Sequence, residues 1–167
     1  MADPPASRIT LHASCVTLGD DGILILGPPG AGKSDLVLRL IDAPGRGTGQ
    51  ELIGARLVAD DQTVIERRGE ALYASSPPAI AGLLEIRGQG IVAVDHVPQA
   101  RLSLVVRLVP AAEIERLPDN AGISRIAGVA LPEIAIDPSK VTAGARIRAA
   151  LTAVPRHELR QIRQGEA

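Results

Sequence analysis

The 167-residue chain carries 18 basic and 19 acidic side chains, for a net charge of −1, and 46% of its residues are hydrophobic. This length and composition fit one globular domain and exclude a disordered tail or a coiled coil as the overall structure. Tyr73 is the single aromatic residue, so surfaces that stack on bases or sugars are excluded and no nucleic-acid partner is expected.

The sequence also predicts a cytoplasmic protein without a membrane segment. The lone cysteine, Cys15, suits a reducing compartment. The N-terminus lacks the basic and apolar regions of an export signal. No apolar run approaches the roughly 20 residues that a membrane-spanning helix needs.

In chain order, residues 1–8 are polar and proline-rich and are predicted to be a disordered tail, followed by a folded domain over 9–154 and a basic helix or tail over 155–167. Hydrophobic patterning and turn signals define the expected elements. The expected strands cover residues 12–18, 23–26, 55–59, 91–94 and 102–109, with a hairpin of 63–66 and 71–74. The expected helices cover 33–42, a short segment from Pro77 to Leu84, and a segment from an N-cap at Asp137 to about Val154, and residues 44–50 are expected to form a mobile surface loop. The order predicts an α/β fold with mixed, partly antiparallel sheets flanked by helices, rather than a doubly wound parallel sheet, because hairpins outnumber clear βαβ units.

Residues 27–34 match the nucleotide-binding P-loop pattern G-x-x-x-x-G-K-[ST] at every fixed position. A buried-type strand precedes the motif and a helical pattern follows it, which is the context that the motif requires. The backbone N–H groups are expected to surround a phosphate, with Lys33 reaching the β- and γ-phosphates of ATP and Ser34 binding Mg²⁺. The expected nucleotide-binding residues are Gly27, Pro28, Pro29, Gly30, Ala31, Gly32, Lys33 and Ser34.

Two adjacent carboxylates, Asp60 and Asp61, follow the expected strand 55–59. Side chains of adjacent residues at a strand end point to opposite sides, so the pair can divide its roles. One can face the metal or the nucleophile, while the other caps a turn. We expect both to belong to a catalytic site beside the P-loop.

Together with the P-loop, the stretches Val58-Ala59-Asp60-Asp61 and Leu83-Leu84-Glu85-Ile86-Arg87-Gly88-Gln89-Gly90-Ile91 resemble the HPr kinase/phosphorylase catalytic domain. The second stretch is that family's signature, and the likeness runs from about His12 to the C-terminal helix. It resembles the short, catalytic-domain-only form of alphaproteobacteria. The resemblance implies a P-loop core similar to that of PEP carboxykinase, a homo-oligomer (hexameric in the family), and ATP-dependent phosphorylation of a serine of HPr or an HPr-like phosphocarrier of the phosphotransferase system. Many members of the family also reverse the reaction, using inorganic phosphate and releasing pyrophosphate.

The resemblance also implies roles for single residues. Asp60 matches the residue that takes the serine proton, and Ser34 and Glu85 match the Mg²⁺ ligands. A guanidinium is needed where charge develops on the transferred oxygens, and Arg87 or Arg116 can supply it. The full set of expected catalytic residues is His12, Lys33, Asp60, Asp61, Arg87 and Arg116.

The sequence departs from the family pattern at several places. The P-loop carries Pro28-Pro29, a glycine-rich insertion covers residues 44–50, and Asp137-Pro138-Ser139-Lys140 replaces the segment tied to dephosphorylation. This last departure leaves the reverse reaction open but does not affect the kinase direction. A kinase of small metabolites and a non-catalytic nucleotide sensor are the alternatives to a kinase of HPr.

Overall fold

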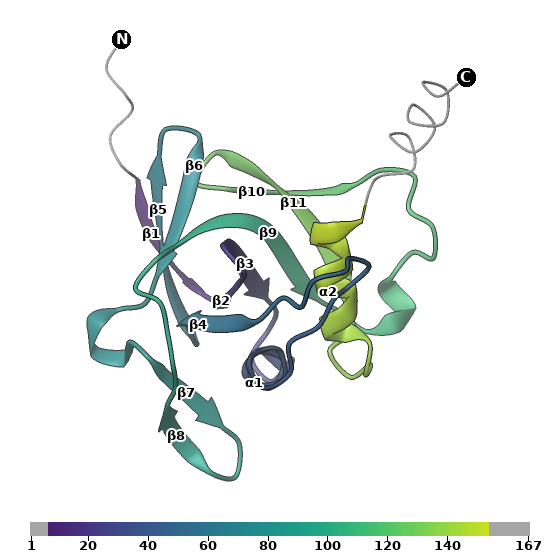
Figure 1. The fold of residues 1–167 in the computed structure, drawn as a ribbon. Coiled ribbons are helices and arrows are strands. Elements are labelled where there is room, and N and C mark those ends of the chain that lie inside the picture. The colour runs from purple at the N-terminus through teal and green to yellow at the C-terminus, as the bar shows by residue number, and fades with distance from the viewer. Residues whose placement is uncertain (1–6, 154–167) are drawn as a thin grey trace.

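A computed structural model describes residues 7–153 of the chain as a curled mixed sheet with two helices packed against it (Figure 1). Within this part, the main sheet has nine strands, seven of which lie in the order β1-β5-β6-β9-β3-β2-β4. The other two are β11, which pairs in parallel with β9, and β10, which pairs with β11. A separate hairpin of β7 and β8 projects from the body (Figure 1). The predicted α/β class with mixed, partly antiparallel sheets is confirmed.

The strands and helices have the following bounds. The strands are β1 (Arg8–His12), β2 (Ser14–Leu18), β3 (Asp21–Leu26), β4 (Ala55–Ala59), β5 (Gln62–Arg68), β6 (Ala71–Ser75), β7 (Leu83–Ile86), β8 (Gly90–Ala93), β9 (Ala100–Leu108), β10 (Gly122–Ile126) and β11 (Val129–Ile136). The helices are α1 (Lys33–Asp42) and α2 (Ala143–Thr152), and two single 3₁₀ turns cover Pro78–Ile80 and Ala111–Glu113.

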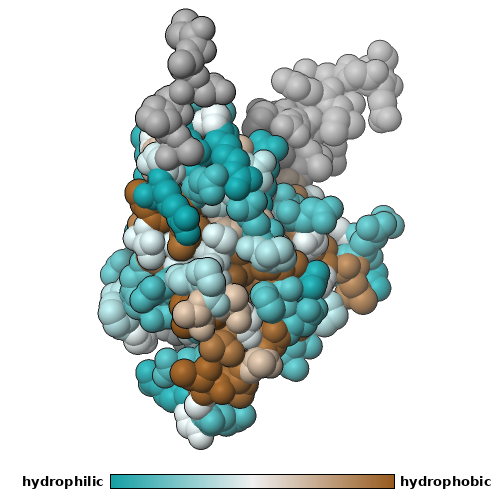
Figure 2. Space-filling view, turned by 90° about the vertical axis from the view of Figure 1, so that its left-hand side faces the viewer, coloured by the Kyte–Doolittle hydropathy of each residue, from teal (hydrophilic) through white to brown (hydrophobic). Residues whose placement is uncertain are grey.

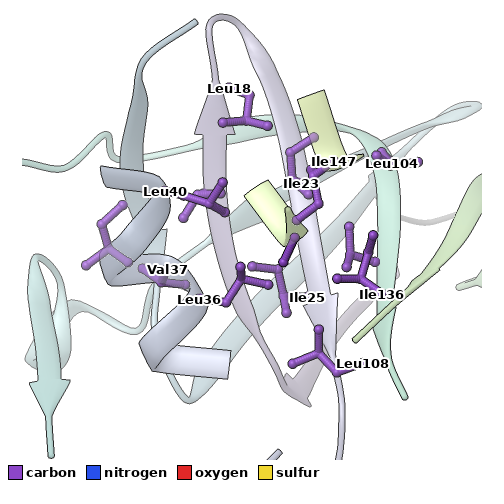
Figure 3. Close-up of a cluster of buried hydrophobic side chains, with 14 of the residues drawn as sticks. Leu18, Ile23, Ile25, Leu36, Val37, Leu40, Leu104, Leu108, Ile136 and Ile147 are labelled. Carbon is purple, nitrogen blue, oxygen red and sulfur yellow. The ribbon is translucent and has the colours of Figure 1, made fainter. Parts of the chain in front are cut away.

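The strand that leads into the P-loop is buried on both faces, as its continuous apolar run predicts. Ile23 and Ile25 of β3 face the helices, whereas Leu24 faces a second core inside the curl of the sheet. In the first core, the side chains of α1 point toward β3 (Figure 3). Leu36 and Leu40 are 0% and 1% exposed, so truncating either to alanine is expected to cost about 2–5 kcal/mol. This packing fixes the direction in which α1 leaves the P-loop.

Several expected elements differ in the structure. The strand predicted for residues 12–18 is interrupted at Ala13 and becomes β1 and β2, and β1 begins at Arg8, inside the expected tail. The helix predicted from Pro77 to Leu84 is a single 3₁₀ turn, because Leu83 already belongs to β7. The strands β10 and β11 were not predicted. The expected basic segment over 155–167 lies outside the described residues.

The N-cap predicted at Asp137 is wrong, since α2 begins at Ala143 with Thr142 at its N-cap. The Asp137 carboxylate instead accepts hydrogen bonds from the backbone N–H groups of Ser139 (2.9 Å) and Ala111 (3.1 Å). Asp137 therefore closes a turn between β11 and α2. An aspartate side chain accepts hydrogen bonds from nearby backbone N–H groups both in turns and at helix N-termini, which explains why the sequence predicted an N-cap here.

Candidate active site

The P-loop lies between β3 and α1 and lines a pocket of about 550 Å³. Gly30 and Gly32 have φ values of +79° and +98°, which residues with a Cβ atom rarely adopt. Gly32 is the N-cap of α1, and no side chain caps this helix. The N–H groups of its first turn are therefore free to bind an anion, and the helix dipole favours negative charge there.

Lys33 of the P-loop is folded back onto its own loop. Its ammonium group donates hydrogen bonds to the carbonyl oxygens of Gly27 (2.7 Å) and Pro28 (3.1 Å), and the residue is 7% exposed. Burial lowers the pKa of Lys33, whereas the negative charges of Asp61 and Asp60 oppose that shift. The carbonyl oxygens hold the ammonium group at the floor of the pocket, where a bound phosphate can replace them.

Asp60 and Asp61 are adjacent in sequence but face different surroundings. Asp60 is 6% exposed, and its Oδ1 accepts a 2.7 Å hydrogen bond from Ser14. The hydroxyl of Ser34 lies 2.9 and 3.0 Å from the two Asp60 oxygens, and the backbone N–H of Glu85 lies 3.4 Å from Oδ2. Asp60 is thus part of a buried cluster behind the P-loop and does not line the pocket.

Asp61 lines the pocket itself. Its φ of +64° lies in the left-handed region, which turns its side chain away from that of Asp60 as β4 reverses into β5. Its Oδ1 lies 3.2 Å from Nδ1 of His12, and the two side chains are 65% and 48% exposed. An exposed carboxylate beside an imidazole can accept a proton from a bound hydroxyl.

The hairpin of β7 and β8 supplies one wall of the pocket. Glu85, Ile86 and Arg87 line it at the end of β7. Gly82 at the base of the hairpin accepts a hydrogen bond from the N–H of Val94 (2.9 Å), and a Cβ atom there would lie 2.6 Å from Nδ1 of His96. The hairpin therefore depends on this glycine for its attachment.

The predicted residues that the pocket brings together are His12, Pro29, Gly30, Ala31, Gly32, Lys33, Ser34, Asp61, Glu85 and Arg87. Arg116, which follows β9 in the chain, is not among the lining residues. Sequence reasoning missed Ser14, which is buried two residues after His12, and the turn residues Pro138 and Ser139, which form another part of the wall. Ser14 could have been predicted as a site residue from its position only two residues after His12. The sequence marked residues 137–140 as a departure from the family pattern, but nothing local placed them in this pocket, because they lie more than 100 positions after the P-loop.

The residues present fit a magnesium ion. A hydroxyl and a buried carboxylate already touch at Ser34 and Asp60. The backbone N–H of Glu85 lies 3.4 Å from Asp60, and Glu85 lines the pocket. Oxygen ligands of this kind are those that Mg²⁺ prefers. No helix within residues 7–153 is long and apolar enough to cross a membrane.

Comparisons with known proteins show the family to which the chain belongs. The family model described as the HPr Serine kinase C-terminal domain matches residues 4–164. The chain belongs to this family. HPr kinase/phosphorylase of Burkholderia lata is 32% identical over 168 residues, which cover 95% of this chain and 48% of that protein. The protein of the same name from Limosilactobacillus reuteri is 32% identical over 142 residues, which cover 78% of this chain and 41% of that protein.

Among solved structures, the Hpr(Ser) kinase/phosphatase from Coxiella burnetii matches with a TM-score of 0.71 and 26% identity, over 92% of this chain and 98% of that one. The two chains thus match over nearly their whole lengths. The chain spans less than half the length of the curated relatives that it matches.

Proposed function

We propose that the pocket binds ATP and transfers its γ-phosphoryl group to a serine hydroxyl of an HPr-like phosphocarrier. The observation that carries this proposal is the separation of the two carboxylates: Asp60 contacts Ser34 behind the P-loop, and Asp61 with His12 lines the pocket. One acid group is thereby available for the metal site and the other for the incoming alcohol. The names of the relatives, HPr kinase/phosphorylase and Hpr(Ser) kinase/phosphatase, support the substrate class.

In this mechanism Asp61, rather than Asp60, accepts the proton of the attacking serine hydroxyl. The serine oxygen bonds to the γ-phosphorus, the bond to the bridging oxygen breaks, and ADP leaves. A base must reach the hydroxyl of a large acceptor from the pocket surface, and Asp61 is 65% exposed whereas Asp60 is 6% exposed. His12 orients the Asp61 carboxylate through its contact with Oδ1.

The other residues bind and position the nucleotide. Lys33 exchanges the carbonyl oxygens of Gly27 and Pro28 for phosphate oxygens. Ser34, Glu85 and Asp60 are the residues that would hold Mg²⁺. The ion, when bound, neutralises charge on the phosphates. Arg87 lines the pocket, so its guanidinium, in preference to that of Arg116, is proposed to stabilise the transferred group.

An exposed apolar side chain beside the pocket favours a protein acceptor over a small metabolite. Ile91 of β8 pairs directly with Glu85 of β7 and is 70% exposed. Figure 2 shows hydrophobic side chains gathered low on the face that carries this hairpin. A protein substrate would cover such a surface, whereas a small metabolite would leave it in water.

The central test compares the variants Asp61→Asn and Asp60→Asn. With purified protein, HPr, ATP and Mg²⁺, Asp61→Asn is expected to abolish phosphoserine formation while ADP binding persists. Asp60→Asn is expected to weaken Mg²⁺-dependent nucleotide binding. An HPr whose serines are replaced by alanine is the acceptor control. Undiminished transfer by Asp61→Asn would remove Asp61 from its proposed role.

The acceptor surface has its own test. Ile91→Asp is expected to raise the KM for HPr about tenfold or more, with unchanged ADP affinity. The reason is that it places a charge on the β7–β8 surface that the protein substrate is proposed to cover. Ile123→Asp on β10, where the side chain is also exposed (68%), is the matched control and should leave this KM unchanged. Equal effects of the two variants would argue against the β7–β8 surface.

The reverse reaction is a second candidate activity, which the words phosphorylase and phosphatase in the relatives' names favour. In that direction inorganic phosphate attacks the phosphoserine, and serine and pyrophosphate are released. Incubation of phosphoserine-HPr with inorganic phosphate, followed by measurement of pyrophosphate, tests it. A homo-oligomer of six copies and a cytoplasmic location stay predictions, and light scattering and cell fractionation would test them.

A further inference from the structure

A second open pocket of about 340 Å³ lies between α2 and the loop after α1. The loop belongs to the glycine-rich insertion that separates this sequence from the family pattern. The pocket's charged lining residues are Arg39, Asp42, Arg46 and Arg148. Three of these side chains are cationic and one is acidic, so the lining carries a net positive charge. Nothing in the proposed phosphoryl transfer uses this pocket.

Arg148 is a buried cation without a carboxylate partner among the described residues. It is 3% exposed, and its hydrogen bonds go to backbone carbonyl oxygens, from Nε to Ile53 (3.0 Å) and from Nη2 to Leu40 (3.2 Å) and Ala43 (3.0 Å). Within residues 7–153, Nη1 has no such partner. Burial lowers the pKa of Arg148. The guanidinium therefore joins the end of α1 to Ile53, which follows the insertion, and its Nη1 group retains donors for a ligand.

The free Nη1 group is directed to the part of the pocket where α2 begins. A Cβ atom on Gly45 or Gly144, both of which line the pocket, would lie 3.3 or 3.4 Å from Nη1. Gly47 has a φ of +59°, and a Cβ atom there would lie 2.6 Å from the carbonyl carbon of Arg148. Gly45 thus allows the loop to approach the guanidinium closely, and Gly47 allows it to approach the backbone of α2.

The N-terminus of the ten-residue helix α2 opens into the same pocket. Its N-cap residue, Thr142, makes no side-chain capping hydrogen bond, and its first turn holds no acidic residue. Gly144 and Ala145, in that first turn, line the pocket. The N–H of Ala143 donates to the carbonyl oxygen of Lys140 (3.0 Å), which leaves the N–H groups of Gly144 and Ala145 for an anion. The positive end of the helix dipole attracts an anion at the same place.

We propose that this pocket is a second anion site, which binds inorganic phosphate or a phosphate monoester independently of the P-loop. The Arg148 guanidinium and the N–H groups of the first turn of α2 bind the phosphate oxygens. Arg46 at the rim adds a second positive charge. A tetrahedral oxyanion suits this arrangement because donors reach it from two elements of the fold.

The probe is inorganic phosphate, titrated by calorimetry at fixed ionic strength into the variant Lys33→Ala, in which the P-loop site is disabled. Saturable binding is expected to persist. Adding Ala145→Glu places a carboxylate in the pocket and is expected to weaken phosphate binding at least tenfold, while the charge at the start of α2 favours the helix and keeps the protein folded. Ala150→Glu, at an exposed position of the same helix outside the pocket, is the matched control and should bind phosphate as the parent does.

Loss of all saturable phosphate binding in Lys33→Ala would overturn the proposal, because the P-loop would then account for it. Equal phosphate affinity of the Ala145→Glu and Ala150→Glu variants would overturn it as well. Arg46→Gln gives a second reading, with a smaller expected loss of about threefold to tenfold, since it removes one rim charge and leaves the buried guanidinium in place. Phosphate affinity unchanged in both Ala145→Glu and Arg46→Gln would place the anion elsewhere.

Discussion

The hydroxyl of Ser14 lies 2.7 Å from Oδ1 of Asp60, and the two residues are 0% and 6% exposed. The same Asp60 oxygen lies 2.9 Å from the hydroxyl of Ser34 in the P-loop. Ser14 on β2 and Ser34 on α1 therefore hold one carboxylate from two sides. Asp60 is set in position by the fold before any ligand binds.

Ser14→Ala is expected to lower the free energy of unfolding by about 1–3 kcal/mol, because it leaves a buried carboxylate with one donor fewer. It should also raise the Mg²⁺ concentration needed for half-maximal transfer several-fold. Urea unfolding and a Mg²⁺ titration of activity measure the two effects. Ser103→Ala, which removes a 2.6 Å hydrogen bond to Asp21 at an exposed site, is the control and should change neither value appreciably.

Alanine substitutions of Arg87 and Arg116 are expected to differ in their effect on kcat. Arg87→Ala is expected to lower kcat about 10²-fold, because the guanidinium lines the pocket where charge develops. Arg116→Ala should leave kcat within about threefold, since Arg116 is exposed and does not line the pocket. Steady-state kinetics with HPr measure both. A larger loss for Arg116→Ala would show that this residue reaches the phosphates in the working enzyme.

Gly82 and Gly69 are a matched pair for the attachment of the β7–β8 hairpin. Both have positive φ values, +73° and +60°, so alanine at either is expected to cost about 1–2 kcal/mol of stability. A Cβ atom at Gly69 meets nothing within 4 Å, whereas at Gly82 it meets the His96 ring at 2.6 Å. Gly82→Ala alone should therefore displace Glu85 and Arg87. The expected result is a fall in kcat/KM for Gly82→Ala with near-normal activity for Gly69→Ala, and equal activity losses would contradict it.

The lowered pKa of Lys33 leads us to expect two pH dependences of opposite sign, one of ADP affinity and one of stability. Burial lowers its pKa, so the ammonium loses its proton at lower pH than an ordinary lysine, and ADP affinity should fall with it. The unfolded chain binds that proton more tightly, so the Lys33 contribution to stability should rise as the pH increases from the folded-state pKa to the ordinary value. Calorimetry and urea unfolding from pH 8 to 10 measure these slopes, and Lys33→Met should remove both. Parallel slopes in the parent would contradict the assignment.

The sequence by itself determined the nucleotide-binding half of the site. The P-loop, the strand before it and the helix after it are contiguous, so local pattern and glycine spacing suffice to predict them. Asp60, Asp61 and Glu85 were found for the same reason, because short motifs mark them. The resemblance assigned proton acceptance to Asp60, whereas we propose Asp61. The difference arises from the left-handed backbone at Asp61 and from a hydrogen bond to Asp60 from Ser14, 46 positions away.

Tertiary structure alone decided the remaining parts. The curl of the sheet brings β1 and β5 together, so that His12 meets Asp61, and the turn closed by Asp137 joins the pocket wall. The start of α2 shifted from its predicted place because the Asp137 carboxylate binds the N–H groups of Ser139 and Ala111 instead. The second pocket needed α2 to pack beside the insertion, where Arg148 reaches carbonyl oxygens over 90 positions away. Contacts of this range leave no local pattern, because the energy that selects them is gained when distant segments pack together.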